Sequence, residues 1–325
     1  MRIAVTGGAG YIGSHTVLEL LDRGYEVIVI DDLSHGYRHN VPPGLLREIT
    51  LGDTAAVEAA LTEKPVGAVI HFAAFISVGE SMQHPEAYFQ NNTCASLSLF
   101  TAMLRAGIKK LVFSSTAAVY GMPQSVPIKE EFPYAAVNVY GESKVFVEKI
   151  LDWFDLIHQL KSVCLRYFNA SGADPRGRRG EEHQPETHLI PLLFRAIETG
   201  KPIKVFGADY PTPDGTCIRD YIHVTDLAQA HIFAVEHLIA GGASEKFNAG
   251  TGKGFSVKHM IESVEKVTGQ KVPYEIGPRR DGDPPELVAD SSKLQRVLGW
   301  KPRFAQLDEI VQTAWNFEKS RVISR

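Results

Sequence analysis

The sequence predicts an α/β fold, in which a doubly wound parallel sheet is followed by a smaller C-terminal lobe. Short apolar runs alternate with helix-like runs through the first 168 residues. After residue 169 the chain becomes polar and rich in turn residues, beginning with "ASGADPRGRRGEEHQPETH". Parallel strands need long crossovers, which the intervening helices supply. We therefore expect a first domain over 1–168 and a second lobe over 169–325, with some later segments returning to the first domain.

The individual elements of the first domain follow from hydrophobic period and length. Apolar runs typical of buried parallel strands cover 2–6, 26–30, 67–73, 109–115 and 162–169. Helical patterns follow the first strand through "SHTVLELLDRG", then cover "TAAVEAALTEK", the segment around 86–106 and the segment from Tyr140 onward. The second lobe shows shorter alternating pieces, among them "IKVFG", "RDYIHV", "DLAQAHIFAVEHLI" and "KFNAG".

Composition excludes several classes of protein. Apolar residues make up 44% and charged residues 22% of the 325 residues, and the net charge is −4 without any basic run. This argues against nucleic acid or an anionic membrane as a partner. The longest apolar stretch, "GAVIHFAAFISVG", is too short for a membrane span, and the first ten residues do not resemble a signal peptide. Three widely spaced cysteines predict reduced thiols, so we expect a cytoplasmic protein.

A glycine triplet directly after the first strand predicts a dinucleotide site of the Rossmann type. Gly7, Gly10 and Gly13 form Gly-x-x-Gly-x-x-Gly and open the first helix. Glycines here permit a tight turn, close approach of the backbone to a pyrophosphate, and close packing of helix on strand. The phosphates would lie at the helix N-terminus, where free amides favour negative charge.

Carboxylates after the strands indicate which dinucleotide binds. Asp31 ends the second strand, where it can accept both ribose hydroxyls of adenosine and would repel a 2′-phosphate. This favours NAD over NADP. Asp32 beside it is either a second contact or a solvated side chain. Asp53 is either a partner of the adenine amine or the N-cap of the helix beginning "TAAVE", and the two roles are compatible.

A tyrosine and a lysine lie one helical turn apart in "NVYGESKVFVEKIL". Among the eleven tyrosines only Tyr140 has a lysine, Lys144, four residues later. A phenol has a pKa of about 10, so it is a poor base at neutral pH. A nearby ammonium and a positive nicotinamide would favour the phenolate. The alternative is an ordinary pair, in which the tyrosine is half-buried and the lysine is solvated.

Several sequence blocks together resemble the extended short-chain dehydrogenase/reductase family. They are "TGGAGYIG", "HFAA", "FSSTAAVYG", "YGESK" and "RYFN". The later blocks "GEEHQPETHLIP", "DYPTPDGTCIRDYIHV", "NAGTGKGFSV" and "RRDGDPP" are similar to its UDP-glucose 4-epimerase members. The resemblance implies tightly bound NAD and reversible epimerisation at C4 of UDP-glucose and UDP-galactose through a transient 4-keto sugar. It also implies a homodimer built from the helices around 86–106 and 139–160.

The resemblance carries functional roles onto individual residues. The implied catalytic residues are Thr116, Tyr140 and Lys144. The implied cofactor contacts are Gly7, Gly10, Tyr11, Ile12, Gly13, Asp31, Asp32, Asp53, Thr54, Phe72, Ala73, Ala74, Asn91, Tyr140, Lys144 and Tyr167. The implied substrate contacts are Thr116, Asn169, His188, Leu189, Phe206, Arg219, Arg280, Asp283 and Leu287. Within this last set the arginines would bind the diphosphate, Phe206 the uracil and Asp283 the uridine ribose, and Leu287 would limit the size of the sugar.

Two positions depart from the pattern of some relatives. Ile76 stands where some epimerases have a lysine that touches the cofactor. Thr187 and His188 stand where others have two asparagines. Although His183 and His188 could ligate a metal, no third ligand is apparent nearby in sequence, so we expect no metal site.

Three other functions compete with this interpretation. A nucleotide-sugar 4,6-dehydratase would need an Asp-Glu pair after Thr116, where this chain has Ala117 and Ala118. A catalytically silent NAD-sensing protein would be expected to have lost Tyr140 or Lys144, and both are present. A UDP-N-acetylhexosamine 4-epimerase differs from the favoured function only in the size of the sugar that it accepts.

Overall fold

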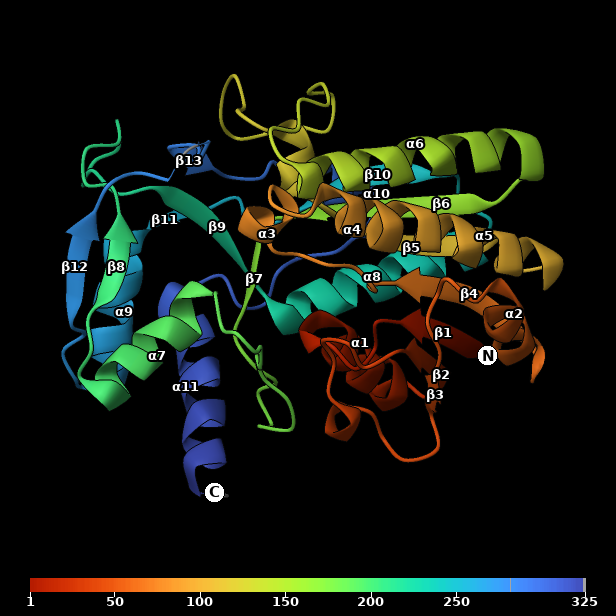
Figure 1. Cartoon of the computed structure of the whole chain (residues 1–325), viewed down its shortest axis with the longest axis horizontal. Helices are drawn as coiled ribbons and strands as arrows, with labels where there is room; N and C mark the ends of the chain where they lie inside the picture. The colour runs from red at the N-terminus through yellow and green to blue at the C-terminus, as the bar shows by residue number, and fades with distance from the viewer. Residues whose placement is uncertain (281, 324–325) are drawn as a thin grey trace.

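A seven-stranded parallel sheet with the strand order β10-β6-β5-β4-β1-β2-β3 forms the centre of the larger lobe. The structure is a computed structural model that describes residues 1–280 and 282–323 (Figure 1). The strands are β1 (Arg2–Thr6), β2 (Glu26–Asp31), β3 (Leu46–Glu48), β4 (Val66–His71), β5 (Lys110–Thr116), β6 (Lys161–Tyr167) and β10 (Glu245–Ala249). The order reverses between β1 and β4, which confirms the predicted doubly wound fold.

Helices cover both faces of this sheet. One face is covered by α1 (Tyr11–Asp22), α8 (Val224–Ile239) and α10 (Ser292–Leu298), and the other by α2 (Thr54–Thr62), α5 (Ala95–Arg105) and α6 (Val139–His158). The strand residues between them are almost fully buried, as the continuous apolar runs in the sequence predict. Short helices fill the connections: η1 (Arg38–Asn40), α3 (Val78–Ser81), α4 (Pro85–Tyr88) and η3 (Ala117–Tyr120).

The smaller lobe has its own hydrophobic core beside the carboxyl ends of the large sheet (Figure 1). Its strands are β7 (Asn169–Ser171), β8 (Ile203–Phe206), β9 (Ile218–His223), β11 (Gly254–Ser256), β12 (Tyr274–Gly277) and β13 (Glu286–Leu287). Its helices are α7 (Leu189–Thr199), α9 (Val257–Thr268) and α11 (Leu307–Ile323). A glycine in the left-handed conformation ends each of α7, α9 and α10, as expected where a helix stops and the chain turns.

The chain crosses between the lobes more than once. After β9 it returns to the larger lobe through α8, and β10 then pairs with β6 at the edge of the large sheet. Residues 224–249 of the second half therefore contribute to the first core. The division at residue 168 between an NAD-binding domain and a UDP-sugar-binding lobe, with later segments returning to the first, stays a prediction.

The predicted long helix around 86–106 is interrupted by a π-helix. The helical path runs through α4, the π-helix η2 (Phe89–Cys94) and α5. Within η2, the Asn92 side chain accepts from the backbone N–H of Phe75 at 2.8 Å and donates to Ser143 Oγ at 3.1 Å. The wide turn thus ties the loop after β4 to α6. Such turns are frequent at functional sites.

The long helix α6 is fixed to the sheet by a buried ion pair. Glu148 and Arg166 lie 2.6 Å apart, with side chains that are 0% and 3% exposed. The Glu148 carboxylate also accepts from the Ser115 and Tyr134 hydroxyls. At its N-terminus, α6 is capped by Asn138, whose side chain accepts from the N–H of Gly141 at 2.8 Å.

Across 1–280 and 282–323, none of the helices is both long enough and apolar enough to cross a membrane.

Candidate active site

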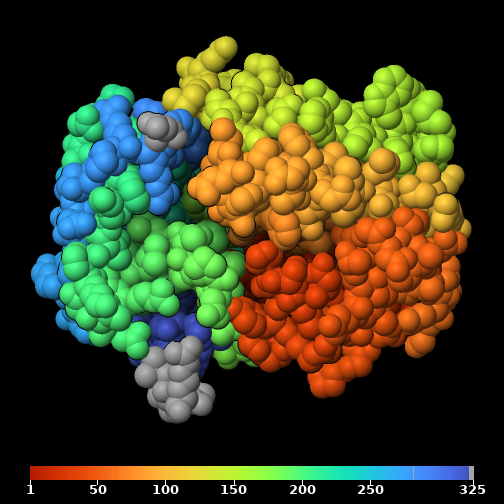
Figure 2. Space-filling model, viewed as in Figure 1, coloured from red at the N-terminus to blue at the C-terminus, as the bar shows by residue number. Residues whose placement is uncertain are grey.

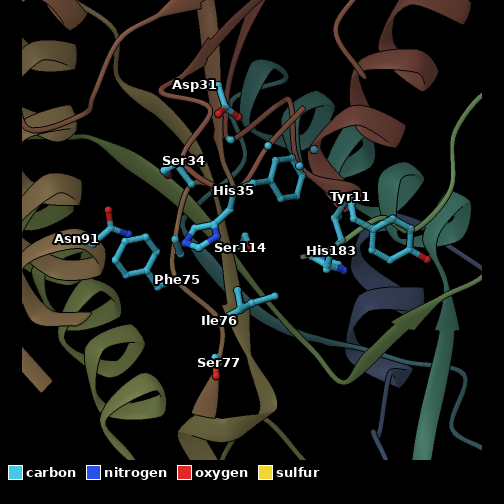
Figure 3. Close-up of a pocket in the computed structure, with 18 of the residues that line it drawn as sticks. Tyr11, Asp31, Ser34, His35, Phe75, Ile76, Ser77, Asn91, Ser114 and His183 are labelled. Carbon is cyan, nitrogen blue, oxygen red and sulfur yellow. The ribbon is translucent and has the colours of Figure 1, made fainter. Parts of the chain in front are cut away.

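A cavity of about 650 Å³ lies at the carboxyl ends of the central strands, where the strand order reverses. Figure 2 shows the smaller lobe lying against the N-terminal part of the larger one, with the surface hollowed between them. The loops after β1, β2, β3 and β4, the end of β5, the start of α6 and the segment after β6 all contribute to the lining (Figure 3). Segments from both halves of the chain therefore converge on one site.

The glycine loop has the geometry that a dinucleotide pyrophosphate requires. Gly7 has a φ of +71°, and a Cβ there would lie 2.5 Å from the backbone nitrogen of Ala73. A Cβ on Gly13 would lie 2.1 Å from the Gly7 carbonyl oxygen. A Cβ on Gly10 would instead meet only that oxygen, at 3.4 Å, while Gly10 itself lines the cavity. Since the N-cap residue of α1 is Gly10, which has no side chain to cap the helix, the first amides of α1 can bind phosphate.

Asp31 is held in place by the backbone. Its two carboxylate oxygens accept from the N–H groups of Ala9 and Leu33, each at 2.9 Å, and the residue is 8% exposed. Burial raises the pKa of the carboxyl above its usual value, and the two N–H groups oppose that shift. Each oxygen has a further lone pair for a ribose hydroxyl. The exposed neighbour Asp32 also lines the cavity.

Tyr140, Lys144 and Thr116 line the same cavity. Tyr140 lies in the first turn of α6, and the Lys144 amino nitrogen is 6.0 Å from the centre of its ring. That nitrogen donates to the Ser114 carbonyl oxygen at 3.0 Å. The Thr116 hydroxyl accepts from the N–H of Ala118, so it also caps η3.

Burial disfavours the charged form of both side chains of the pair. It lowers the pKa of Lys144 to about 7, although the negative charge of Glu148 works in the other direction. It raises the pKa of Tyr140, and a hydrogen bond with Thr116 opposes that change. The chain without its cofactor therefore does not lower the pKa of Tyr140 as the sequence pattern suggests. Activation by Lys144 stays a prediction for the enzyme with bound NAD.

Most of the expected cofactor contacts lie on the cavity wall. Fourteen of the sixteen line it: Gly7, Gly10, Tyr11, Ile12, Gly13, Asp31, Asp32, Phe72, Ala73, Ala74, Asn91, Tyr140, Lys144 and Tyr167. Asp53 and Thr54 do not line it. Asp53 is exposed and caps α2, accepting from the N–H of Ala56 at 3.0 Å, so its contact with adenine stays a prediction. Ile76, the departure from the lysine of some relatives, is on the wall and 47% exposed.

The expected substrate contacts fall into two groups. Thr116, Asn169 and His188 line the cavity. Leu189, Phe206, Arg219, Arg280, Asp283 and Leu287 do not line it and lie farther into the smaller lobe or at its boundary.

Within the second group the structure forms three local contacts. The Arg280 guanidinium lies 4.0 Å from the centre of the Phe206 ring. Arg219 is ion-paired with Asp283. Leu287 packs against a cluster that includes Tyr120 and Val145 of the larger lobe. The binding roles of these residues stay predictions.

Several wall residues were not expected from the sequence. Among them are Ser34, His35, Phe75, Ser77, Ser114 and His183 (Figure 3). Glu181 also lines the cavity. The rings of His35 and Phe75 meet edge to face with centres 5.1 Å apart. The only available signal for most of them was their place in loops that follow strands at the carboxyl edge of the sheet.

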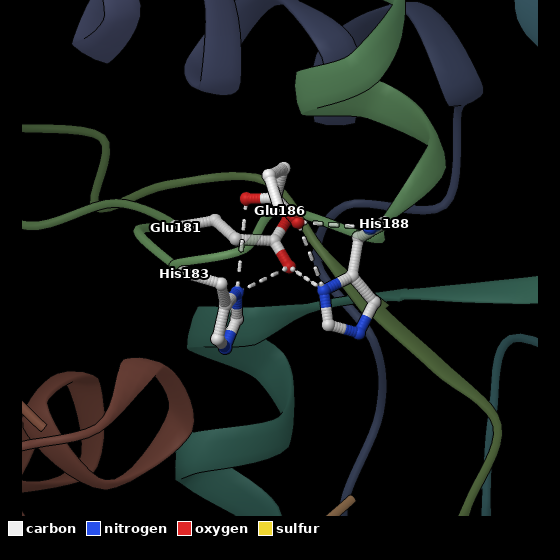
Figure 4. A group of neighbouring side chains, drawn as sticks. All are labelled: Glu181, His183, Glu186 and His188. Atoms are coloured by element: carbon white, nitrogen blue, oxygen red, sulfur yellow. Dashed lines mark hydrogen bonds and ion pairs between the residues drawn. The ribbon is translucent and has the colours of Figure 1, made fainter. Parts of the chain in front are cut away.

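The loop before α7 gathers two histidines and two glutamates. The Nδ1 atom of His188 lies 2.9 Å from Glu181 Oε1 and 3.3 Å from Glu186 Oε1 (Figure 4). Burial lowers the pKa of His188, but the two carboxylates outweigh it and raise that pKa to about 10. The sequence argument that no third potential ligand lies near His183 and His188 was therefore wrong.

Comparison with known protein families agrees with this geometry. The family model described as "NAD dependent epimerase/dehydratase family" matches residues 3–250. This chain belongs to that family. The epimerase/dehydratase family is NAD-dependent, and the glycine loop and Asp31 fit that cofactor.

Individual relatives match over almost the whole chain. A UDP-glucose 4-epimerase of Halalkalibacterium halodurans is 50% identical, with 98% of this chain and 96% of the relative covered. The crystal structure of UDP-glucose 4-epimerase from Brucella ovis in complex with NAD is 43% identical and superposes with a TM-score of 0.95, covering 97% of this chain and 98% of that one. The enzyme from Bifidobacterium longum, solved with NAD⁺ and UDP, is 38% identical with a TM-score of 0.93 and 99% of both chains covered.

Replacing Asp31 tests how this epimerase/dehydratase family member selects its dinucleotide. We expect Asp31→Ala to purify with less NAD and to discriminate less against NADP, because the carboxylate that would repel a 2′-phosphate is gone. Asp31→Asn is the matched control, since it removes the charge but keeps an acceptor oxygen. Bound nucleotide is measured after denaturation. An Asp31→Ala protein that retains all its NAD and still rejects NADP would show that Asp31 does not recognise the ribose.

Proposed function

We propose that this chain is a UDP-glucose 4-epimerase, which interconverts UDP-glucose and UDP-galactose with NAD held in the cavity. The observation that carries the proposal is that one cavity is lined by the glycine loop, Asp31, Thr116 and Tyr140. A proton acceptor for a sugar hydroxyl thus lies beside a dinucleotide site. The close relatives described above carry the same name over nearly their full length.

The chemistry is divided between cofactor and protein. NAD, when bound, supplies the acceptor and donor of the hydride at C4. Tyr140 takes the proton of the 4-hydroxyl as the hydride leaves, and Thr116 binds the same oxygen. Since the chain alone keeps the phenol neutral, the positive charges of the nicotinamide and of Lys144 must together favour the phenolate. Lowering the pKa of Tyr140 by about three units requires about 4 kcal/mol of stabilisation of the phenolate relative to the phenol.

Epimerisation then needs the 4-keto sugar to present its other face. We propose that the UDP portion stays bound to the smaller lobe while the sugar turns. Arg219 and Arg280 would hold the diphosphate, Phe206 would lie against uracil, and Asp283 would bind the ribose. Their positions near β8, β9 and β13 support a separate nucleotide subsite. Since Arg219 is paired with Asp283 in this structure, nucleotide binding must compete with that contact.

The competing functions are less well supported. Ala117 and Ala118 follow Thr116, and neither can supply the acid and base that 4,6-dehydration needs. A silent NAD-sensing protein would not need Tyr140 and Lys144 on the cavity wall, where both lie.

Turnover without added cofactor tests the proposal directly. We expect the purified protein to convert UDP-galactose to UDP-glucose with no added NAD, because the reaction is redox-neutral and NAD stays bound. Tyr140→Phe should keep NAD and UDP-sugar binding but lose about 10²–10⁴-fold in kcat, the usual contribution of a positioned acid–base group. Tyr274→Phe, an exposed tyrosine outside the cavity, is the matched control. Near-normal turnover by a folded Tyr140→Phe enzyme would exclude Tyr140 as the base.

Substrate breadth depends on the space in which the sugar turns. Leu287 is smaller than a tyrosine but larger than a serine, so we expect a preference for UDP-glucose and UDP-galactose with weaker turnover of the N-acetyl pair. Leu287→Tyr should lower N-acetyl turnover and Leu287→Ser should raise it, each by about 10–200-fold, because a size mismatch in an apolar pocket costs about 1–3 kcal/mol. Initial rates on both substrate pairs measure this. Unchanged ratios in both variants would show that Leu287 does not limit the sugar.

We also propose that the protein is a homodimer formed by α5 and α6. Large apolar side chains remain exposed on these helices: Leu97, Phe146, Trp153, Leu156 and Ile157 are between 40% and 65% exposed. An apolar stripe of this size on two adjacent helices fits pairing with a second copy of the same helices, as in a four-helix bundle.

Trp153→Arg tests the dimer. It should convert the protein to a monomer in light scattering at micromolar concentration, because it places a charge in the apolar contact. Ile276→Arg, which alters an apolar residue that is 50% exposed on β12, should remain dimeric. A monomeric wild type, or a dimeric Trp153→Arg variant, would contradict this interface.

A cytoplasmic location is proposed on the state of the thiols. All three cysteines are free, and Cys164 and Cys217 are buried. A reducing compartment suits such a protein. Cell fractionation tests the location, and recovery outside the cytoplasm would contradict it.

A further inference from the structure

Four side chains in the loop between β7 and α7 converge on a single point. They are Glu181, His183, Glu186 and His188, and one potential ligand atom from each lies within 4.8 Å of all the others. The four carboxylate-to-imidazole distances are 2.9, 3.3, 3.6 and 3.8 Å. Ligands on a tetrahedral zinc ion with bonds of 2.0–2.2 Å would be about 3.4 Å apart. The observed distances lie on both sides of that value.

The atoms at this point do not satisfy one another. Glu181 Oε1, His183 Nδ1 and His188 Nδ1 are buried and have no hydrogen-bond partner within residues 1–280 and 282–323. The Glu181 side chain is only 8% exposed. Although His188 Nδ1 is 2.9 Å from Glu181 Oε1, the contact lacks the direction of a hydrogen bond. Carboxylate oxygens and imidazole nitrogens that meet at one point without hydrogen bonds are an arrangement that a cation satisfies when it displaces the imidazole protons.

The position of the four side chains beside the glycine loop gives an electrostatic reason for a cation to bind there. Glu181, His183 and His188 line the cavity that also contains the glycine loop. The His183 ring meets the ring of Tyr11, the first residue of α1, edge to face with centres 6.1 Å apart. Two carboxylates this close to a site for diphosphates would repel them. A divalent cation held between the carboxylates would cancel that repulsion.

We propose that Glu181, His183, Glu186 and His188 bind one divalent transition-metal ion, for which Zn²⁺ is the best match. Two imidazoles and two carboxylates in a compact set suit zinc better than Mg²⁺ or Ca²⁺, which prefer six or more oxygens. Four protein ligands leave no open position, so the role is structural and the ion takes no part in the chemistry at C4. It would fix residues 172–188 against the cavity.

Metal content and thermal stability of the untagged holoenzyme test the site without measuring activity. After dialysis against a chelator, titration with ZnCl₂ should show one ion bound per chain. At a hundredfold excess over Kd, Zn²⁺ should raise Tm by about 5 °C. Co²⁺ in the same position should give the visible absorption of a tetrahedral complex.

Variants distinguish Zn²⁺ binding at this site from non-specific Zn²⁺ binding by surface histidines. Loss of a residue that only contacts a metal ligand typically weakens metal binding by about 10–100-fold. Glu181→Gln and His183→Gln each remove a ligand, so each should weaken Zn²⁺ binding by more than that. His84→Gln removes an exposed histidine whose Nδ1 lies 3.9 Å from Glu86, and should leave stoichiometry and affinity unchanged.

Two results would overturn the proposal. One is the absence of stoichiometric Zn²⁺ in the wild type, which would mean that a protonated His188 alone balances the carboxylates. The other is binding that persists unchanged in a folded double variant, Glu181→Gln with His183→Gln. Neither result depends on epimerase activity, so the proposed function and this site can fail separately.

Discussion

The buried attachment of α6 to the sheet is the constraint on which the active site depends. Glu148 and Arg166 form an ion pair in the interior, and the Ser115 and Tyr134 hydroxyls complete the hydrogen bonds of the carboxylate. Removing one partner of such a pair generally costs about 3–5 kcal/mol, because the other charge is left buried and unpaired. The geometry of the pair fixes α6 against β5 and β6. It therefore sets where Tyr140 lies relative to Thr116.

This arrangement has an electrostatic consequence for catalysis. Lys144 is 3% exposed and is held by a carbonyl, not by a carboxylate. Burial accordingly lowers its pKa to about 7 and raises that of Tyr140. The protein by itself thus keeps Tyr140, the proposed proton acceptor, in its neutral form. A tyrosine that is deprotonated only when cofactor and substrate are bound does not exchange its proton with solvent in unproductive steps.

The sequence was sufficient to predict those features of the fold and the site that depend on a local residue pattern. The parallel strands were visible as apolar runs because both faces of the sheet are covered. The glycine loop and Asp31 were visible because the turn after β1 and the end of β2 each need a particular residue type at a fixed spacing. The π-helix around Asn91 was not visible, because the residue pattern indicates a helix without distinguishing one π turn from an α turn.

Features that depend on the path of a long loop were beyond sequence reasoning. Residues 172–188 fold so that Glu181 and Glu186 meet two histidines, although polar loop residues in sequence predict only exposure. The edge strand β10 was also hard to place, because its partner β6 lies about eighty residues earlier in the chain. Asp53 could not be assigned one role from sequence, because its position fits both an adenine contact and a helix N-cap. The structure shows only the helix cap.

In the proposed reaction, hydrogen at C4 leaves and returns as a hydride within the one cavity. The most direct measurement uses UDP-galactose with deuterium at C4, converted by the enzyme in ordinary water and analysed by mass spectrometry and NMR. We expect the UDP-glucose formed to keep the full label at C4, because neither the hydride nor the keto sugar exchanges with solvent. Loss of the label to water would contradict it, because it would show that C4 loses a proton instead of a hydride.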